Sequence, residues 1–249
     1  MRKSRIVLCL AVATGSLLVV LAIGIVRWIQ FLPLLAFQNE TALYALPEPI
    51  PRTPNPPNIQ ETTEFQAFGY RFTLPWHPVA GRIKNERVAG LMFETGPVFL
   101  LHNPHVTIGW RDDFVRPENR FVLEKLESAY GEDCCANVFE IVTLILNATP
   151  ERLSFLRSFG RNSADALLLT YKRMYLDKVR TLSFIAHENL RAYQIGEATD
   201  AEPVRLLIFA GNEVELRVDI GRMKQGVTQA EIDAVLAGFD LGTTDRNSN

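Results

Sequence analysis

Two histidines stand close enough in the sequence to suggest metal chemistry. His102 and His105 belong to the segment His-Asn-Pro-His, and Asp112 and Asp113 follow shortly afterwards. Imidazole and carboxylate groups are common zinc ligands, so a turn that joined both histidines to one aspartate would make a site. However, Pro104 favours an extended residue before it, and no cysteine or glutamate at a fixed spacing completes a ligand set. We favour loop or edge histidines and expect no bound metal.

Cys134 and Cys135 are adjacent in the sequence. In an oxidising compartment they could form a disulfide, although a bridge between neighbours strains the backbone. Two buried thiols, or one thiol paired between chains, are equally consistent with the sequence. Redox enzymes usually place two residues between their cysteines, which argues against a catalytic pair. Cys9 lies in an apolar segment and is not expected to reach them.

The remaining polar motifs favour surface positions over catalysis. Glu124 and Glu127 would share one helix face, but their polar neighbours favour solvent over a catalytic pair. Trp76 and Trp110 could line a ligand groove, but aromatic residues at alternating strand positions are more often core. No nucleophile elbow, phosphate loop or dinucleotide fingerprint occurs. We expect no catalytic residues, no cofactor and no enzymatic activity.

The element that positions everything else is an apolar stretch near the N-terminus. Ile6 to Val26 contains no charged residue and, as a helix, would span roughly 30 Å, the thickness of a bilayer core. Three basic residues precede it, and Arg27 alone follows closely, so the N-terminus is expected in the cytoplasm and the rest outside. We predict a single-pass signal anchor in the cell (inner) membrane, with an extracytoplasmic, periplasmic domain.

A cleaved secretory signal is the alternative reading of this stretch. Its apolar region would be shorter, and a small-x-small cleavage site should follow it. Ala11-Val12-Ala13 lies too deep in the apolar run, and Leu43-Tyr44-Ala45 has a poor residue at its first position. We favour a retained anchor, and both readings export the domain.

The sequence divides into four parts. Residues 1–37 hold a cytoplasmic stub, the anchor and an interfacial segment with Trp28 and Phe31. Residues 38–64 contain six prolines and predict an extended spacer, with a proline-recognition ligand as the alternative. Residues 65–241 predict one folded domain, large enough to bury a core, and residues 242–249 a disordered tail.

Alternating apolar residues predict several strands in the domain. Phe68 to Leu74 places three aromatic residues and a leucine on one face, and Val214 to Ile220 alternates with charged residues after a Gly211-Asn212 turn. Further strands are expected in segments of similar pattern: Val88–Glu94, Val98–His102, Val106–Trp110, Ala166–Tyr175, Thr181–Ala186, Arg191–Gly196 and Val204–Phe209.

Four segments predict helices. Val122, Leu126 and Tyr130 recur every four residues after Pro117, and Val138–Leu146 is nearly all apolar, with Asp133 as the expected N-cap. A further helix is expected to restart at Thr149-Pro150-Glu151 and continue through Leu153 and Leu156. Thr228 and Glu231 form a capping box that opens a helix carrying Ile232, Val235, Leu236 and Phe239. Antiparallel strands with helices packed on one face make the class α+β.

The motif Phe68-x-Tyr-x-Phe-x-Leu-Pro-Trp76 and this order of elements resemble PsbP-like α/β sandwich domains of exported bacterial proteins. The resemblance covers residues 65 to 241 and departs from that family in the long apolar helix at Val138–Leu146. It implies a binding or assembly role. Fold alone does not fix function.

The resulting expectation is a membrane-tethered binding or assembly module held in the lipid bilayer through Ile6–Val26, with an envelope protein as partner. A net charge of −2 gives no basic field for nucleic acid. A metal-dependent envelope hydrolase using His102, His105 and Asp112 or Asp113 is the alternative, and near-stoichiometric metal in purified protein would favour it. A carrier of small apolar ligands is a third reading, which requires a sizeable cavity.

Overall fold

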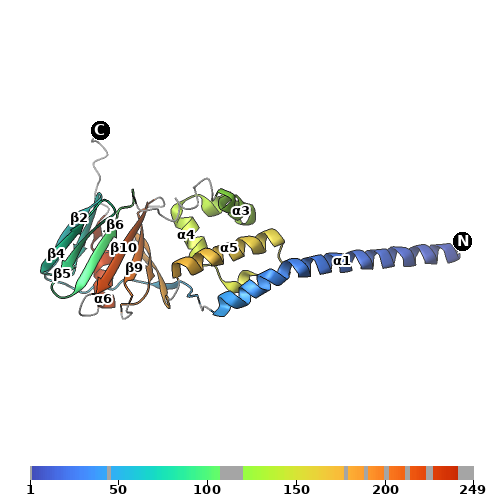
Figure 1. Ribbon diagram of the computed structural model, residues 1–249, viewed down its shortest axis with the longest axis horizontal. Coiled ribbons are helices and arrows are strands. Elements are labelled where there is room, and N and C mark those ends of the chain that lie inside the picture. Colours follow the sequence, from blue (N-terminus) through green and yellow to red (C-terminus); the bar gives the residue numbers. More distant parts are fainter. Residues whose placement is uncertain are drawn as a thin grey trace, which may run out of the picture.

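The computed structural model describes residues 2–43, 46–106, 120–176, 179–187, 190–198, 202–210, 214–222 and 227–240. Two sheets pack face to face, and helices cover the other face of the larger sheet, as Figure 1 shows. The predicted α+β class is confirmed. The predicted strand at Val106–Trp110, the Pro117 helix start, the Gly211-Asn212 turn and the tail lie largely or wholly outside the described residues.

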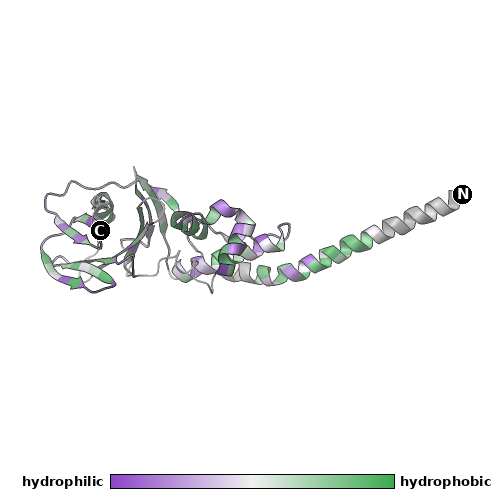
Figure 2. Ribbon diagram, turned by 90° about the horizontal axis from the view of Figure 1, so that it is seen from above, coloured by the Kyte–Doolittle hydropathy of each residue, from purple (hydrophilic) through white to green (hydrophobic). Residues whose placement is uncertain are grey.

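The N-terminal helix α1 (Arg2–Leu43) projects from the rest of the molecule (Figure 1). Within its described part, Ser16–Ala36 is long and apolar enough to cross a membrane, and none of this window is buried. Figure 2 shows much of this projecting stretch in the colour of hydrophobic residues. An apolar helix of spanning length is therefore confirmed. The helix runs far beyond its predicted end at Val26 and contains Pro33.

The spacer predicted over Gln38–Glu64 differs from the structure in two places. Its first residues continue α1 to Leu43, and β1 (Ile50–Arg52) joins the large sheet, pairing in parallel with β7 (Leu182–His187). Pro51 is tolerated in β1 because β1 is the edge strand of this sheet, and an edge strand leaves one row of backbone groups unpaired. The folded domain therefore begins before residue 65.

The large sheet has the strand order β1-β7-β8-β9-β10-β6-β5-β4. Its neighbours pair antiparallel, except β1 with β7, so the sheet is mixed where an antiparallel sheet was predicted. Its other strands are β4 (Val79–Lys84), β5 (Val88–Phe93), β6 (Pro97–His102), β8 (Leu190–Ile195), β9 (Val204–Ala210) and β10 (Val214–Arg222). The predicted pairing of the last two is confirmed, with Leu216 opposite Ile208.

The small sheet packs on one face of the large sheet. It consists of β2 (Thr63–Ala67), β3 (Tyr70–Leu74) and β11 (Phe239–Asp240), and α6 (Gln229–Ala237) lies beside it. Phe72 is fully buried between the sheets, 5.1 Å from the Phe99 ring. The capping box of Thr228 and Glu231 is present, and Glu231 also accepts from the Trp76 indole at 2.9 Å. Trp76 is therefore core, as the sequence favoured.

A helical layer covers the opposite face over β7, β8 and β9. It contains α3 (Arg120–Tyr130), α4 (Val138–Leu146) and α5 (Phe159–Leu176), joined by the 3₁₀ turns η2 (Glu132–Cys135) and η3 (Pro150–Arg152). The bounds predicted for α4 are confirmed, but its N-cap is Asn137, whose side chain accepts from the Glu140 amide, and not Asp133. The restart expected at Thr149 gives only the short turn η3.

The strand predicted at Ala166–Tyr175 is wrong, because these residues belong to α5. Leu168, Leu169, Lys172 and Leu176 are buried, a spacing of three and four residues that fits one face of a helix. The run Ala-Leu-Leu-Leu-Thr is apolar without clear period, and such short runs do not distinguish a strand from a buried helix.

Candidate functional site

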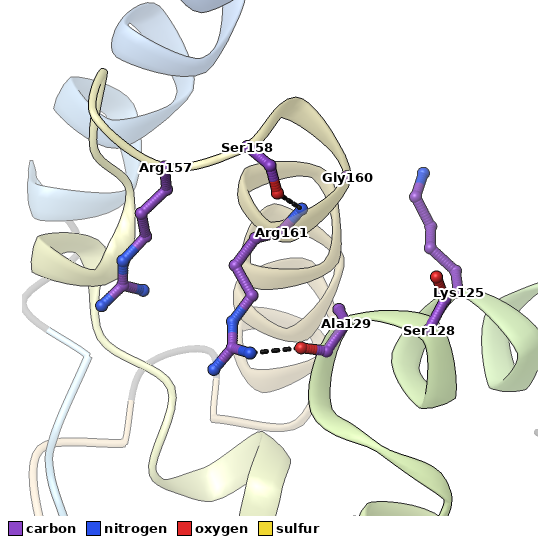
Figure 3. A pocket seen from close by; sticks show the side chains of 7 residues that line it. All are labelled: Lys125, Ser128, Ala129, Arg157, Ser158, Gly160 and Arg161. Carbon is purple, nitrogen blue, oxygen red and sulfur yellow. Dashed lines mark hydrogen bonds between the residues drawn. The ribbon is translucent and has the colours of Figure 1, made fainter.

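A hollow of about 540 Å³ opens between α3 and the start of α5 (Figure 3). In Figure 1 these two helices lie between the sheets and the projecting part of α1. The hollow is lined by Lys125, Ser128, Ala129, Arg157, Ser158, Gly160 and Arg161. We call it the basic hollow, because three of its seven lining residues are cations and none is an acid.

Two arginines of the basic hollow are held in place by neighbours. Arg157 donates to the buried carboxylate of Asp165 at 3.2 Å, while 43% of its own side chain stays exposed. The Arg161 guanidinium lies 4.0 Å from the centroid of the Tyr130 ring and donates to the Ala129 carbonyl. Figure 3 shows both guanidinium groups pointing the same way. Their side chains are therefore fixed before any ligand arrives.

The buried carboxylate of Asp165 neutralises part of the positive charge of the basic hollow. It is fully buried, and it accepts hydrogen bonds from Tyr130 and Arg157. Burial, together with the bond to Asp165, raises the pKa of Tyr130 to about 12, so the phenol remains a donor at all physiological pH values. Lys125 lies across the hollow, with no ionic partner among the described residues (Figure 3). The exposed face keeps a positive excess that suits an anion such as phosphate.

A second, small hollow connects this region to α1. It is lined by Arg27, Gln30, Phe31, Leu34, Phe155, Arg157, Phe159 and Asn162. Arg157 lines both hollows. The basic hollow therefore begins next to the half of α1 that packs on the domain.

His102 and His105, the histidines of the predicted metal pair, have different surroundings. The Nε2 atom of His102 lies 2.8 Å from Asp219 Oδ2, and Asp219 also accepts from Arg205 and Arg217. Burial alone would raise the pKa of Asp219, but the hydrogen bonds from His102 and Arg217, with the two guanidinium charges, hold it well below its usual range. The Asp219 carboxylate thus binds His102 within a network of three positively charged or polar donors.

His105 is exposed, and its backbone amide donates to Asn103 Oδ1 at 2.9 Å. Asp112 and Asp113 lie outside the described residues. Within the described chain, no group of three or more His, Cys, Asp or Glu side chains is placed to hold a metal ion. The alternative of a metal-dependent hydrolase that uses these residues therefore stays untested.

Cys134 and Cys135 are free thiols in η2, half-buried, with their sulfur atoms 2.9 Å apart. Burial raises the pKa of both thiols, so little thiolate exists near neutral pH. No bridge joins the two thiols in this structure, and pairing of one thiol between chains stays a prediction. Disulfide formation on oxidation stays a prediction.

Comparison of the chain with protein-family models, curated proteins and solved structures found no match. The sequence did not predict the basic hollow, because its cations come from segments about thirty residues apart that only the packing of α3 on α5 brings together. One signal was present: Arg157 and Arg161 stand only four residues apart in the sequence, on either side of the start of α5 at Phe159.

Proposed function

We propose that this chain is a single-pass, membrane-tethered, extracytoplasmic binding or assembly module without enzymatic activity. The observation that supports it is the apolar helix α1, which projects from the domain and has no buried residue in the window Ser16–Ala36. An exposed apolar surface of this size is unfavourable in water, and a bilayer is the environment that satisfies it. The C-terminal half of α1 packs on α5 and η3, which holds the domain close to the membrane.

We propose the orientation of α1 in the membrane from the basic residues on either side of its apolar stretch. Arg2, Lys3 and Arg5 precede the apolar stretch, whereas Arg27 alone follows it closely, which favours a cytoplasmic N-terminus in the inner membrane. The resemblance of Phe68 to Trp76 to PsbP-like domains supports an assembly role in the same proposal.

A groove at the end of the domain far from α1 is where we place the partner contact. It has a volume of about 310 Å³ and runs between β2 and the β4–β5 hairpin. Its lining includes Phe65, Phe68, Ile83 and Leu91, with Arg82 and Lys84 beside them. Phe68 has a backbone φ of 54°, a left-handed conformation that is unusual for a bulky residue and is often found at functional positions.

Two measurements test this proposal in intact cells. A reporter that is active only outside the cytoplasm, fused after Asn249, should be active, and a cytosolic reporter at the same place should be silent. A photo-cross-linking residue at Lys84 should capture an envelope protein, whereas one at Met174, on the helical layer, should not. Cytosolic activity of the fusion refutes the topology, and capture of this chain alone at Lys84 refutes the partner role.

A further inference from the structure

We propose that the loop before α5 and the basic hollow form a membrane-contact surface, in which Leu156 and Phe159 enter the bilayer interface and the cations bind phosphate groups of anionic lipids. This inference rests on the proposed function, because it requires α1 to span the bilayer. It adds a second attachment to the membrane, made by the folded domain itself.

The position of the loop relative to α1 supports this surface. The Phe155 ring lies 6.0 Å from Phe31 and 6.5 Å from Trp28, centroid to centroid. Trp28 and Phe31 directly follow the uncharged stretch that ends at Val26, at the level where a spanning helix leaves the hydrocarbon. The loop therefore lies at the height of the lipid headgroups.

The side chains at this height have the polarity of an interface. Leu156 is 85% exposed and Phe159 is 55% exposed, next to an Arg157 whose charged end remains accessible. A leucine exposed to this extent gains nothing from the protein core, and burial at the boundary of the acyl chains removes it from water. Arginines beside such apolar residues extend their charges to the headgroup level.

The charges around the loop favour anionic lipids. Arg27, Lys125, Arg157 and Arg161 line the two adjoining hollows. Among the acids nearby, Asp165 is buried under Arg157, Glu124 pairs with Arg120 at 3.2 Å, and Glu127 lies near Cys134 and Cys135. The basic hollow has room for a phosphodiester headgroup, and each cation near an anionic surface strengthens attachment. Phosphate is the shared chemistry, and the location beside α1 selects the lipid as its source.

Photo-cross-linking of the full chain in lipid nanodiscs tests this surface. A photo-reactive residue is placed in turn at Leu156, at Phe159 and at Trp28, and at Met174 as the matched control. Met174 is also on α5 and 68% exposed. We expect lipid adducts from Leu156, Phe159 and Trp28, at a yield about ten-fold above that of Met174.

The pattern of adducts distinguishes a failure of the contact surface from a failure of the membrane anchor. Adducts at Trp28 without adducts at Leu156 or Phe159 overturn the contact surface and leave the anchor in place. No adducts at any of the three overturn both.

A second measurement tests the lipid class. With a probe at Ser128, in the basic hollow, a labelled anionic phospholipid in a zwitterionic bilayer should be captured about five-fold above its mole fraction. Lys125→Glu should remove this enrichment, while Lys84→Glu, on the distant strand β4, should leave it unchanged. Capture in proportion to mole fraction overturns the lipid assignment. If the chain in purely zwitterionic nanodiscs then binds inorganic phosphate saturably, the basic hollow is a site for a soluble anion.

Discussion

Lys172 is a fully buried lysine in α5, and its ammonium donates to the Ala148 carbonyl at 2.9 Å. Burial, which disfavours the charged form, lowers its pKa from 10.5 to about 8. Between these two values the unfolded chain binds more protons than the folded chain. The stability contributed by this group therefore rises with pH across that window, and below it the contribution is constant and unfavourable.

We predict that Lys172→Met removes this pH dependence. The difference in unfolding free energy between wild type and variant should grow in favour of wild type from about pH 8 to about pH 10, by at most ~1.4 kcal/mol per pH unit. Denaturant unfolding at several pH values measures it, with Lys84→Met, an exposed lysine, as the control. A difference that is flat with pH would show that the buried amine does not titrate there.

The two thiols of η2 give a second test at the scale of residues. Because burial raises the pKa of Cys134 and Cys135, both should be alkylated slowly near neutral pH. We expect iodoacetamide to label them at least about ten-fold more slowly in folded protein than in urea. Mass spectrometry of peptides reads both sites and would also detect a disulfide. Equal rates in the two states would contradict the burial of these thiols.

At the scale of elements, the junction of α6 and β11 depends on one glycine. Gly238 ends α6, and its carbonyl accepts from the Thr73 amide at 2.8 Å. A Cβ atom at this position would lie 2.2 Å from the Thr73 carbonyl oxygen, which belongs to the backbone and cannot rotate away. This close approach holds α6 and β11 against β3.

Gly238→Ala should therefore destabilise the domain by about 2 kcal/mol or more, through displacement of β11 from β3. Gly160→Ala is the matched control, because a Cβ there meets nothing within 4 Å. In helix α5 that change should be neutral or stabilising by up to about 1 kcal/mol. Thermal unfolding of both variants tests this prediction. Equal melting temperatures for Gly238→Ala and Gly160→Ala would refute the packing argument.

Local signals predicted elements well where several of them agreed. The bounds of α4 and the capping box of α6 follow from side chains within a few residues of one another. By contrast, β1 pairs with β7 more than a hundred residues later, and proline-rich sequence gives no sign of a partner that distant. The basic hollow was missed for the same reason, since tertiary contacts alone unite its cations.

At the scale of the whole molecule, the contact of Phe155 with Trp28 and Phe31 couples α1 to the helical layer. Phe155→Ala should loosen this coupling and expose Leu46, which follows α1 and is partly buried against the helical layer. We expect limited proteolysis in detergent to cut there about ten-fold faster in the variant. Phe121→Ala, which alters an exposed ring on α3, is the control, and unchanged cleavage in both would show that the ring contact does not restrain α1.

The parallel pairing of β1 with β7 has a consequence for how the molecule meets others. Few residues separate Leu43 from Ile50, and even fully extended they reach only about 20 Å. With α1 in a bilayer, as we propose, the domain would stay within a short distance of that bilayer. A protein that it recognises would then have to approach the lipid surface.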